Sequence, residues 1–266
     1  MRYESKVSVV IPVYNGAKFL DQAINSVLDQ TWPNYDLVIV DNASNDDSVK
    51  VASKFQDPRI TIHAESIHLP IYANFNRAAG YATGRFLKFL CADDVLLPPA
   101  LEVLAKVMMD EPLIGIATSK RIVIDENAKQ KGLLQLQHES GHIRSQKALK
   151  LVTLLNNYIG EPSSVLLRRE QFIALGGFDE RFHQLGDLHF WCKILAKHDL
   201  YYHPTALCCY RMHNEQLSWK NLRNFRLWLR EDRWVRQSFR VLGLRKNWIY
   251  RLLLQVQTRT GLRKKY

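Results

Sequence analysis

Residues 84–94, GRFLKFLCADD, decide the fold of this chain. They form a short apolar run that ends in two adjacent carboxylates, Asp93 and Asp94, before Pro98 and Pro99 open a helix-like stretch. Neighbouring acids repel each other, and each favours water or a cation over a protein interior. A solvated turn is one explanation, because Asp is common in turns. A ligand site at the end of a strand is the other, and the rest of the chain must choose between them.

Strands and helices alternate upstream of these acids. Continuous apolar runs predict buried strands at 7–13, 35–41, 59–64 and 84–90, and apolar residues at helical spacing predict helices at 17–30, 48–55 and 71–83. This rhythm indicates right-handed crossovers. It predicts an α/β fold with a mostly parallel, Rossmann-like sheet covered by helices.

Acidic residues follow two of the predicted strands. Asp41 ends the second strand, and Asp93 and Asp94 follow the fourth. Open α/β sheets bind ligands at the carboxyl ends of their strands, so we expect these acids to meet in one crevice. The chain has no GxGxxG after its first strand and no GxxxxGK[ST], which argues against a dinucleotide site and a P-loop. Adjacent carboxylates can instead hold a hard divalent cation that bridges to phosphate.

The composition is that of an ordinary globular protein. With 266 residues and 47% hydrophobic content, the chain can build one large core, or one domain with an appendage. No stretch has the length of a membrane span or the pattern of a signal peptide. The four cysteines form no CxxC pair, which favours reduced, mostly buried thiols. We therefore expect a cytoplasmic chain.

The net charge of +11 is concentrated at the C-terminus. Fourteen of the 37 Lys and Arg residues lie from Trp219 onward, with only two acids, so the first 218 residues are nearly neutral. We predict a catalytic body at 1–218 and a basic amphipathic helical tail at 219–266. The predicted apolar face of a helix at 221–242 consists of Leu222, Phe225, Leu229, Val235, Phe239 and Leu242. Two interpretations stay open: the tail binds an anionic membrane surface, or it packs on the body.

Six segments carry a resemblance to a known family. They are VSVVIPVYNG, VIVDNASNDDS, NRAAGYATGRFLKFLCADD, EPSSVLLRREQFIALGGFDERF, GDLHFWCKI and YRMHNEQLS. In this order the chain resembles the family 2 glycosyltransferases, inverting enzymes with the GT-A fold, over residues 6 to 218. The resemblance implies a nucleotide-sugar donor, expected to be a UDP-sugar, and a divalent metal, Mn²⁺ or Mg²⁺. It also implies a saccharide or lipid-linked acceptor in polysaccharide or cell-envelope biosynthesis, with the protein peripheral on the inner membrane face.

The resemblance also assigns roles to individual residues. Asp187 matches the general base, and we expect the N-terminus of its helix to keep it ionised. The remaining matches are Asp94 for the metal, Asp93 for the donor sugar or ribose, Asp41 for the uracil or ribose, Pro12 and Tyr14 for the base, and His213 for the metal or diphosphate.

This chain departs from the family pattern at three positions. Cys91 stands where many members have an acid, and Gly186 precedes the predicted base where many members have Glu. Pro70 stands where several members place an arginine near the donor phosphate. That contact is therefore expected from Arg77, from Arg211 or from neither.

Two other function classes remain as alternatives. A nucleic-acid-binding protein could use the basic tail, since phosphate contacts dominate such binding. The tail has no zinc spacing or RNA-binding aromatic motif, so we expect no nucleic acid as partner. An inactive transferase-fold scaffold is the other alternative, although Asp94 and Asp187 are both present.

Overall fold

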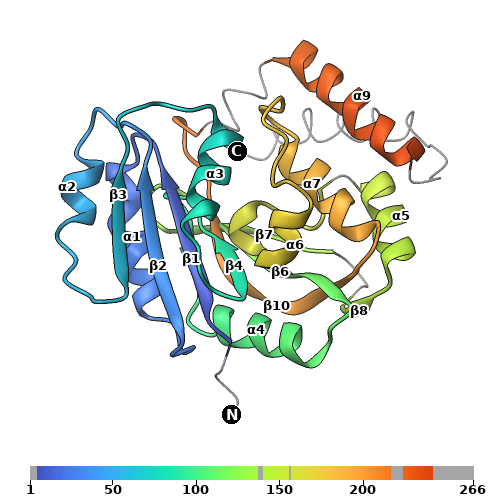
Figure 1. The fold of residues 1–266 in the computed structure, drawn as a ribbon, viewed down its shortest axis with the longest axis horizontal. Helices are drawn as coiled ribbons and strands as arrows, with labels where there is room; N and C mark the ends of the chain where they lie inside the picture. The colour runs from blue at the N-terminus through green and yellow to red at the C-terminus, as the bar shows by residue number, and fades with distance from the viewer. Residues whose placement is uncertain (1–4, 137–139, 156, 217–223, 242–266) are drawn as a thin grey trace.

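The computed structural model describes residues 5–136, 140–155, 157–216 and 224–241, and its N-terminal half confirms the predicted alternation of strands and helices (Figure 1). The three predicted helices end a few residues earlier than expected. The elements of this half are β1 Val7–Val13, α1 Ala17–Leu28, β2 Tyr35–Asp41, α2 Ser48–Ala52, β3 Ile60–Ala64, α3 Ile71–Gly80 and β4 Phe86–Phe89.

The second half mixes two long strands, several short strands and helices. Its strands are β5 Val95–Leu96, β6 Ile114–Ile124, β7 Gln130–Leu134, β8 Gly141–Ile143, β9 Leu166–Arg168 and β10 Asp199–Arg211. Its helices are α4 Ala100–Asp110, α5 Ser145–Leu155, the 3₁₀ turn η1 Pro162–Ser164, α6 Arg169–Ala174, α7 Gly186–Leu195 and α9 Phe225–Val241.

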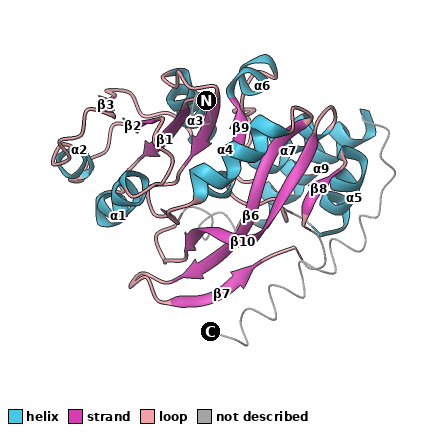
Figure 2. Cartoon of the chain, turned by 90° about the horizontal axis from the view of Figure 1, so that it is seen from below, coloured by secondary structure: helices cyan, strands magenta, loops and turns pink. Residues whose placement is uncertain are grey.

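One sheet runs through the molecule in the order β3-β2-β1-β4-β9-β6-β10-β5. The first four strands of this order are parallel, as predicted, and β6 is parallel to β10. The other pairings are antiparallel: β9 with β4 and β6, β5 and β8 with β10, and β7 with β6. β7 returns directly from β6 through a short turn, which permits only antiparallel pairing. Figure 2 shows β6, β7 and β10 side by side.

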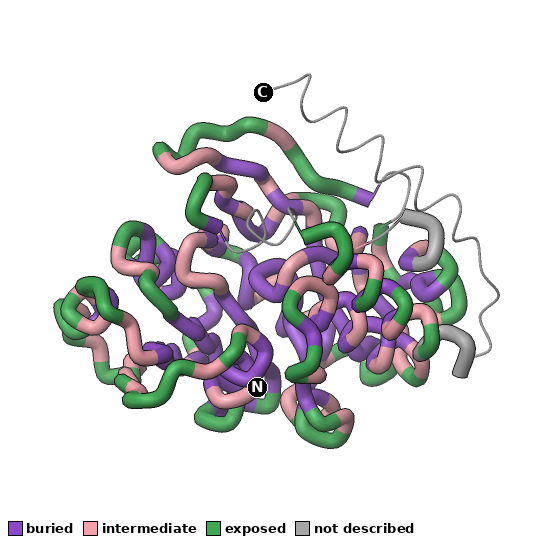
Figure 3. The backbone as a smooth tube through the Cα atoms, turned by 90° about the horizontal axis from the view of Figure 1, so that it is seen from above, coloured by how far each residue is buried: buried purple, intermediate pink, exposed green. Residues whose placement is uncertain are grey.

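The sheet separates two hydrophobic cores. Along β1, Val7, Val9, Ile11 and Val13 pack in one core with α1 and α4, whereas Val10 packs in the other with α3 and α7. This alternation follows from the period of two along a strand, and burial on both faces explains the continuous apolar run. In Figure 3 the interior of the tube is largely buried, and the β7 segment is largely exposed.

Helix α9, from the predicted tail, packs against α7 (Figure 1). Its buried face contains Trp228, Glu231, Asp232 and Val235. Of the predicted apolar face, Val235 is therefore buried and Phe225 is exposed. The predicted boundary at 218 and the side chains of Leu222, Phe239 and Leu242 lie outside the described residues. Among the described helices, none combines the length and apolar character that spanning a membrane requires.

Candidate active site

Two predicted donor residues lie at the carboxyl ends of β1 and β2. Asp41 is opposite Val13 in the parallel register, which brings it beside Tyr14. Asp41 is 4% exposed, and its Oδ2 accepts a hydrogen bond from the Ser44 amide at 2.9 Å. Its Oδ1 is buried and has no hydrogen-bond partner among the described residues. A buried carboxylate oxygen without a donor is costly, so this atom is suited to a ligand N–H or O–H group.

Tyr14, the residue that follows β1, has an accessible aromatic ring. The side chain is 49% exposed, and its ring packs against His68 at a centroid distance of 4.2 Å. The preceding Pro12 is buried within β1. The adjoining loops are held together, because the Asn15 amide donates to Ser44 Oγ at 2.9 Å and the Asn45 amide donates to Asn15 Oδ1 at 3.0 Å.

The two acids after β4 differ in their surroundings. Asp94 is 1% exposed, and its Oδ1 accepts from the Arg211 amide at 2.9 Å. Burial, together with the charge of Asp93, raises the pKa of Asp94 well above its usual range. Asp93 is more exposed, and its Oδ2 lies 3.0 Å from Nε2 of His213. The structure thus brings together Asp93, Asp94 and His213, three of the residues that the resemblance assigned to the metal and the donor.

This cluster fits a divalent cation. Ligand atoms of Cys91, Asp93 and Asp94 all lie within 4.8 Å of one another. A cation would relieve the repulsion between the two carboxylates and the desolvation of Asp94, and carboxylate oxygens suit Mn²⁺ or Mg²⁺. The Nδ1 atom of His213 is buried without a hydrogen-bond partner in the described part of the chain. The carboxylates of Asp93 and Asp94 therefore make the cluster suitable for a divalent cation, and the His213 imidazole lies next to Asp93.

Arg211 has a structural position rather than a ligand-facing one. It is fully buried, and its guanidinium donates to the Asp93 carbonyl at 2.7 Å, the Asp125 carbonyl at 3.1 Å and Gln22 Oε1 at 2.7 Å. The suggested contact of Arg211 with a donor phosphate is therefore wrong. Arg77 donates to Asn42 Oδ1 at 2.6 Å, beside the end of β2.

Asp187 lies in the first turn of α7. Its Oδ1 accepts from the Leu188 amide at 2.7 Å, and its Oδ2 accepts from Asn157 Nδ2 at 3.0 Å. Desolvation raises the pKa of Asp187 to about 7, and the charge of Glu161 adds to this, against the lowering effect of the two hydrogen bonds. Near neutral pH the carboxyl group is therefore only partly ionised, and the helix N-terminus does not hold it ionised as the sequence analysis expected. The loss of water outweighs the helix dipole, which contributes only about 0.3–1 kcal/mol in most settings.

The position of Tyr72 explains why a glycine, Gly186, precedes Asp187. The Tyr72 hydroxyl accepts from the amides of Gly186 and Asp187 at 3.0 and 3.2 Å. A Cβ atom on Gly186 would lie 2.5–2.8 Å from carbons of the Tyr72 ring. Only glycine allows this approach without a shift of the ring, so the departure from the family pattern has a local steric cause.

Glu161 connects the two halves of the candidate site. Its carboxylate raises the pKa of both Asp94 and Asp187, and it forms an ion pair with Arg121 Nε at 3.0 Å. The sequence analysis missed Glu161 as an individual residue, although it opens the EPSS segment that carries the resemblance. It also missed Tyr72, which carries no sequence signal beyond an apolar helical position.

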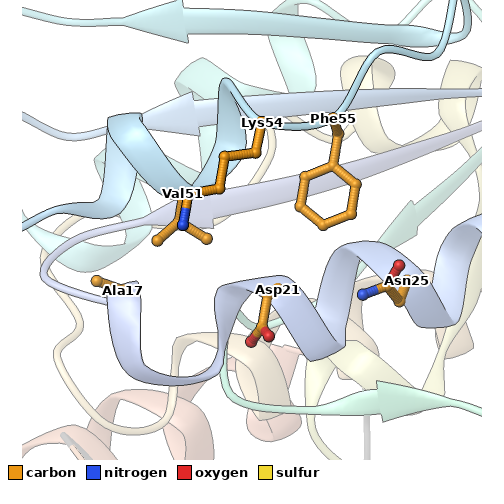
Figure 4. A pocket seen from close by; sticks show the side chains of 6 residues that line it. All are labelled: Ala17, Asp21, Asn25, Val51, Lys54 and Phe55. Carbon is orange, nitrogen blue, oxygen red and sulfur yellow. The ribbon is translucent and has the colours of Figure 1, made fainter.

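A separate groove lies between α1 and α2 (Figure 4). It has a volume of about 350 Å³ and none of the candidate residues lines it. Its walls are formed by Ala17, Asp21, Asn25, Val51, Lys54 and Phe55. The candidate active site is therefore defined by its polar groups rather than by this groove.

Comparisons with known proteins bear on the family and the fold of the chain. The family model described as Glycosyl transferase family 2 matches residues 8–176. An uncharacterized protein of Mycobacterium tuberculosis is 29% identical over 213 residues, which cover 76% of this chain and 65% of that protein.

Two solved structures share the fold. TarS 1-349 of S. aureus in complex with UDP-GlcNAc has a TM-score of 0.65 and 17% identity, over 80% of this chain and 60% of that chain. Mannosyltransferase PcManGT from Pyrobaculum calidifontis, in complex with GDP-Man and Mn²⁺, has a TM-score of 0.61 and 19% identity, over 81% of this chain and 59% of that chain. The GT-A fold expected from the sequence is confirmed. The chain spans less than two thirds of the length of each of these three proteins.

Proposed function

This chain belongs to glycosyl transferase family 2, and from that premise we propose that it is an inverting transferase. It moves a sugar from a nucleoside-diphosphate donor, such as a UDP-sugar, to a hydroxyl group of a saccharide or lipid-linked acceptor. One observation carries the proposal: the segment 157–163 contacts both groups of acids, because Asn157 Nδ2 donates to Asp187 Oδ2 at 3.0 Å and the Cys91 amide, next to Asp93 and Asp94, donates to Ser163 Oγ at 2.9 Å. We infer that an acid pair suited to a cation and an acid suited to proton transfer serve one site. The UDP-GlcNAc and GDP-Man bound to the structural relatives support a nucleotide sugar as the donor.

Asp187 is the proposed general base. The acceptor oxygen forms a bond to the anomeric carbon while its proton passes to the Asp187 carboxylate. The bond from that carbon to the diphosphate oxygen breaks, and its electron pair leaves with the nucleoside diphosphate. A pKa of about 7 suits this role, because the carboxylate is then substantially ionised near neutral pH and is a stronger base than an ordinary aspartate.

Four residues form the proposed donor site. Tyr14 provides a surface on which the base stacks, with Pro12 behind it in β1. The unpartnered Oδ1 of Asp41 accepts a hydrogen bond from the base or the ribose. Asp93 faces a hydroxyl group of the ribose or of the sugar.

Asp94 and His213, with Asp93 beside them, are the proposed ligands of a divalent metal, Mn²⁺ or Mg²⁺. The thiol of Cys91 lies at the edge of this set, and burial raises its pKa well above the ordinary value, so it contributes little as a ligand. The ion, when bound, supplies a Lewis acid that stabilises charge on the leaving diphosphate.

The tail at 219–266 is the proposed contact with an anionic membrane surface on the cytoplasmic side. Arg226, Arg230 and Arg233 recur at helical spacing on the exposed side of α9. Trp228 and Val235 are buried against the body, so the attraction through α9 is electrostatic and should be screened by salt. Co-sedimentation with anionic vesicles, measured at low and high salt, tests this contact. Tight binding of nucleic acid at physiological salt with no vesicle binding would favour the nucleic-acid alternative.

A thermal-shift screen tests the proposed function. UDP, UDP-GlcNAc and GDP-mannose are each added with and without Mn²⁺, and the matching donor should raise the melting temperature in a metal-dependent way. At a ligand concentration of about 100 times Kd, binding raises the free energy of unfolding by about 2.7 kcal/mol. Asp94→Ala should lose the Mn²⁺-dependent shift while its circular dichroism stays that of the folded protein. Undiminished metal-dependent binding in that variant would remove Asp94 from the metal site.

Turnover separates an active enzyme from an inactive scaffold. Asp187→Asn should keep the donor-induced shift and lose release of the nucleoside diphosphate by orders of magnitude. A wild-type chain that binds the donor and releases no nucleotide in the presence of saccharide or lipid-linked acceptors would support the scaffold alternative.

A further inference from the structure

The only two acids of the basic tail are both buried. Glu231 is 0% exposed and Asp232 is 4% exposed, although arginines surround them in the sequence. A buried carboxylate is costly unless hydrogen bonds or an ion pair compensate its lost hydration. Asp232 forms an ion pair with Arg236 one turn along the same helix. The lost hydration of Glu231 is instead compensated by hydrogen bonds from another part of the chain.

Glu231 accepts hydrogen bonds from three consecutive backbone amides. Its Oε1 accepts from His183 N at 2.7 Å, and its Oε2 accepts from Gln184 N and Leu185 N, both at 2.9 Å. Hydrogen bonds to an ionised acceptor are roughly twice as strong as neutral ones. These three residues lead directly into α7, which begins at Gly186.

The amides that follow are also held by side-chain oxygens. The Tyr72 hydroxyl accepts from Gly186 N and Asp187 N, and the Asp187 carboxylate accepts from Leu188 N. The first amides of a helix have no partner within it, so a buried helix start depends on such side chains. Glu231 and Tyr72 therefore fix the segment on which the proposed base lies.

Apolar contacts hold α9 in place over this segment. Val235 is completely buried in the hydrophobic core that includes α7, and the side chain of Trp228 is also buried. The Trp234 ring meets the Phe182 ring edge-on at a centroid distance of 5.5 Å. Residues 183–241 lie beyond the part of the chain that the family model matches, which ends at residue 176.

We propose that Glu231 is a positioning residue. It holds the backbone of residues 183–185 and thereby determines the position of the Asp187 carboxylate and its burial from water. The proposal rests on the proposed function of Asp187 as the base. Small displacements of a reacting group cost large factors in rate, since a shift of about 1 Å can lower turnover about 100-fold. A loosened segment would also admit water to Asp187, whose raised pKa depends on desolvation.

The test compares Glu231→Gln with Asp232→Asn. Both variants remove one buried negative charge from adjacent positions of α9, but Glu231 accepts hydrogen bonds from residues 183–185, whereas Asp232 pairs with Arg236 of its own helix. The assay measures release of nucleoside diphosphate from UDP-GlcNAc or GDP-mannose, whichever raises the melting temperature, with Mn²⁺ present and water as acceptor. Donor affinity is measured separately by calorimetry.

In Glu231→Gln we expect turnover to fall about 10- to 100-fold with unchanged donor affinity. The acidic limb of the rate profile should move to lower pH by about one unit, as water returns to Asp187. Hydrogen exchange of the amides at 183–185 should accelerate in this variant and stay at the wild-type rate in Asp232→Asn. If Glu231→Gln does not fold, Glu231→Asp keeps the charge with a shorter reach, and we expect an intermediate loss of turnover.

Three results would overturn the proposal. They are wild-type turnover in Glu231→Gln, an equal loss of turnover in Asp232→Asn, and a parallel loss of donor affinity, which would indicate general damage to the fold. Failure of the proposed function looks different: Asp187→Asn would then keep wild-type turnover. In that case Glu231 would be a purely structural cap, and the inference would fall with its premise.

Discussion

Replacing Asp187 by Asn should make the protein more stable while it abolishes turnover. The folded chain raises the pKa of this carboxyl group from 3.8 to about 7, mainly through desolvation. The folded state therefore binds the proton more tightly than the unfolded state does. The resulting loss of stability is absent below about pH 4, grows as the pH rises towards 7, and is complete above it. Asn carries no charge at any of these pH values and avoids this loss.

The magnitude follows from the shift and from the hydrogen bonds. A shift of about three units corresponds to about 4 kcal/mol, at 1.36 kcal/mol per unit. Asn keeps one acceptor oxygen, so one of the two contacts, from the Leu188 amide or from Asn157, is lost. That loss costs about 1–2 kcal/mol. The net gain above pH 7 is therefore about 2 kcal/mol, which in a chain of this size raises the melting temperature by roughly 4–8 °C.

Melting temperatures of the wild type and of Asp187→Asn, measured from about pH 4.5 to about pH 8.5, test this reasoning. Titrating groups that do not interact with Asp187 affect both proteins equally, so the difference between the two curves reports on Asp187 and on the groups coupled to it, such as Glu161. We expect the difference in melting temperature between Asp187→Asn and the wild type to increase as the pH rises and to become constant above pH 7. A difference that does not depend on pH, or a less stable variant at pH 8.5, would refute the assignment of a raised pKa.

Three further predictions concern the backbone and the tail. Gly186→Ala should lower the free energy of unfolding by about 1–3 kcal/mol, because the added Cβ would overlap the Tyr72 ring. Gly80→Ala is the control and should be harmless, because the space around Gly80 is open. Urea denaturation measures both variants, and equal effects would contradict the steric reasoning. Ala43→Gly should raise the melting temperature slightly, since the residue has φ +56°, where glycine avoids a cost of about 1 kcal/mol; a lower value would argue against strain. Truncation after Ser218 should lower the melting temperature, because it removes the buried face of α9; an unchanged value would show that α9 does not stabilise the body.

The sequence was informative wherever a signal is local. Apolar runs of the right length predicted β1 to β4, because a strand buried on both faces needs apolar residues at every position. The position of Asp41 at the end of β2, level with the end of β1, also followed from the sequence, since the carboxyl ends of parallel strands share one edge of the sheet. The pairing of the second half did not follow, because β9 lies between β4 and β6 through contacts that are distant in the chain.

By itself, therefore, the sequence determined the alternation of elements, the family resemblance and the residue types that a sugar transferase needs. Only the tertiary structure decided the protonation behaviour of Asp187, because desolvation depends on what surrounds the carboxyl group and not on its neighbours in the chain. It alone turned Glu231 from one acid in a basic tail into the acceptor for three amides next to the proposed base. Such contacts join residues more than 40 positions apart, and no periodicity or local motif encodes them.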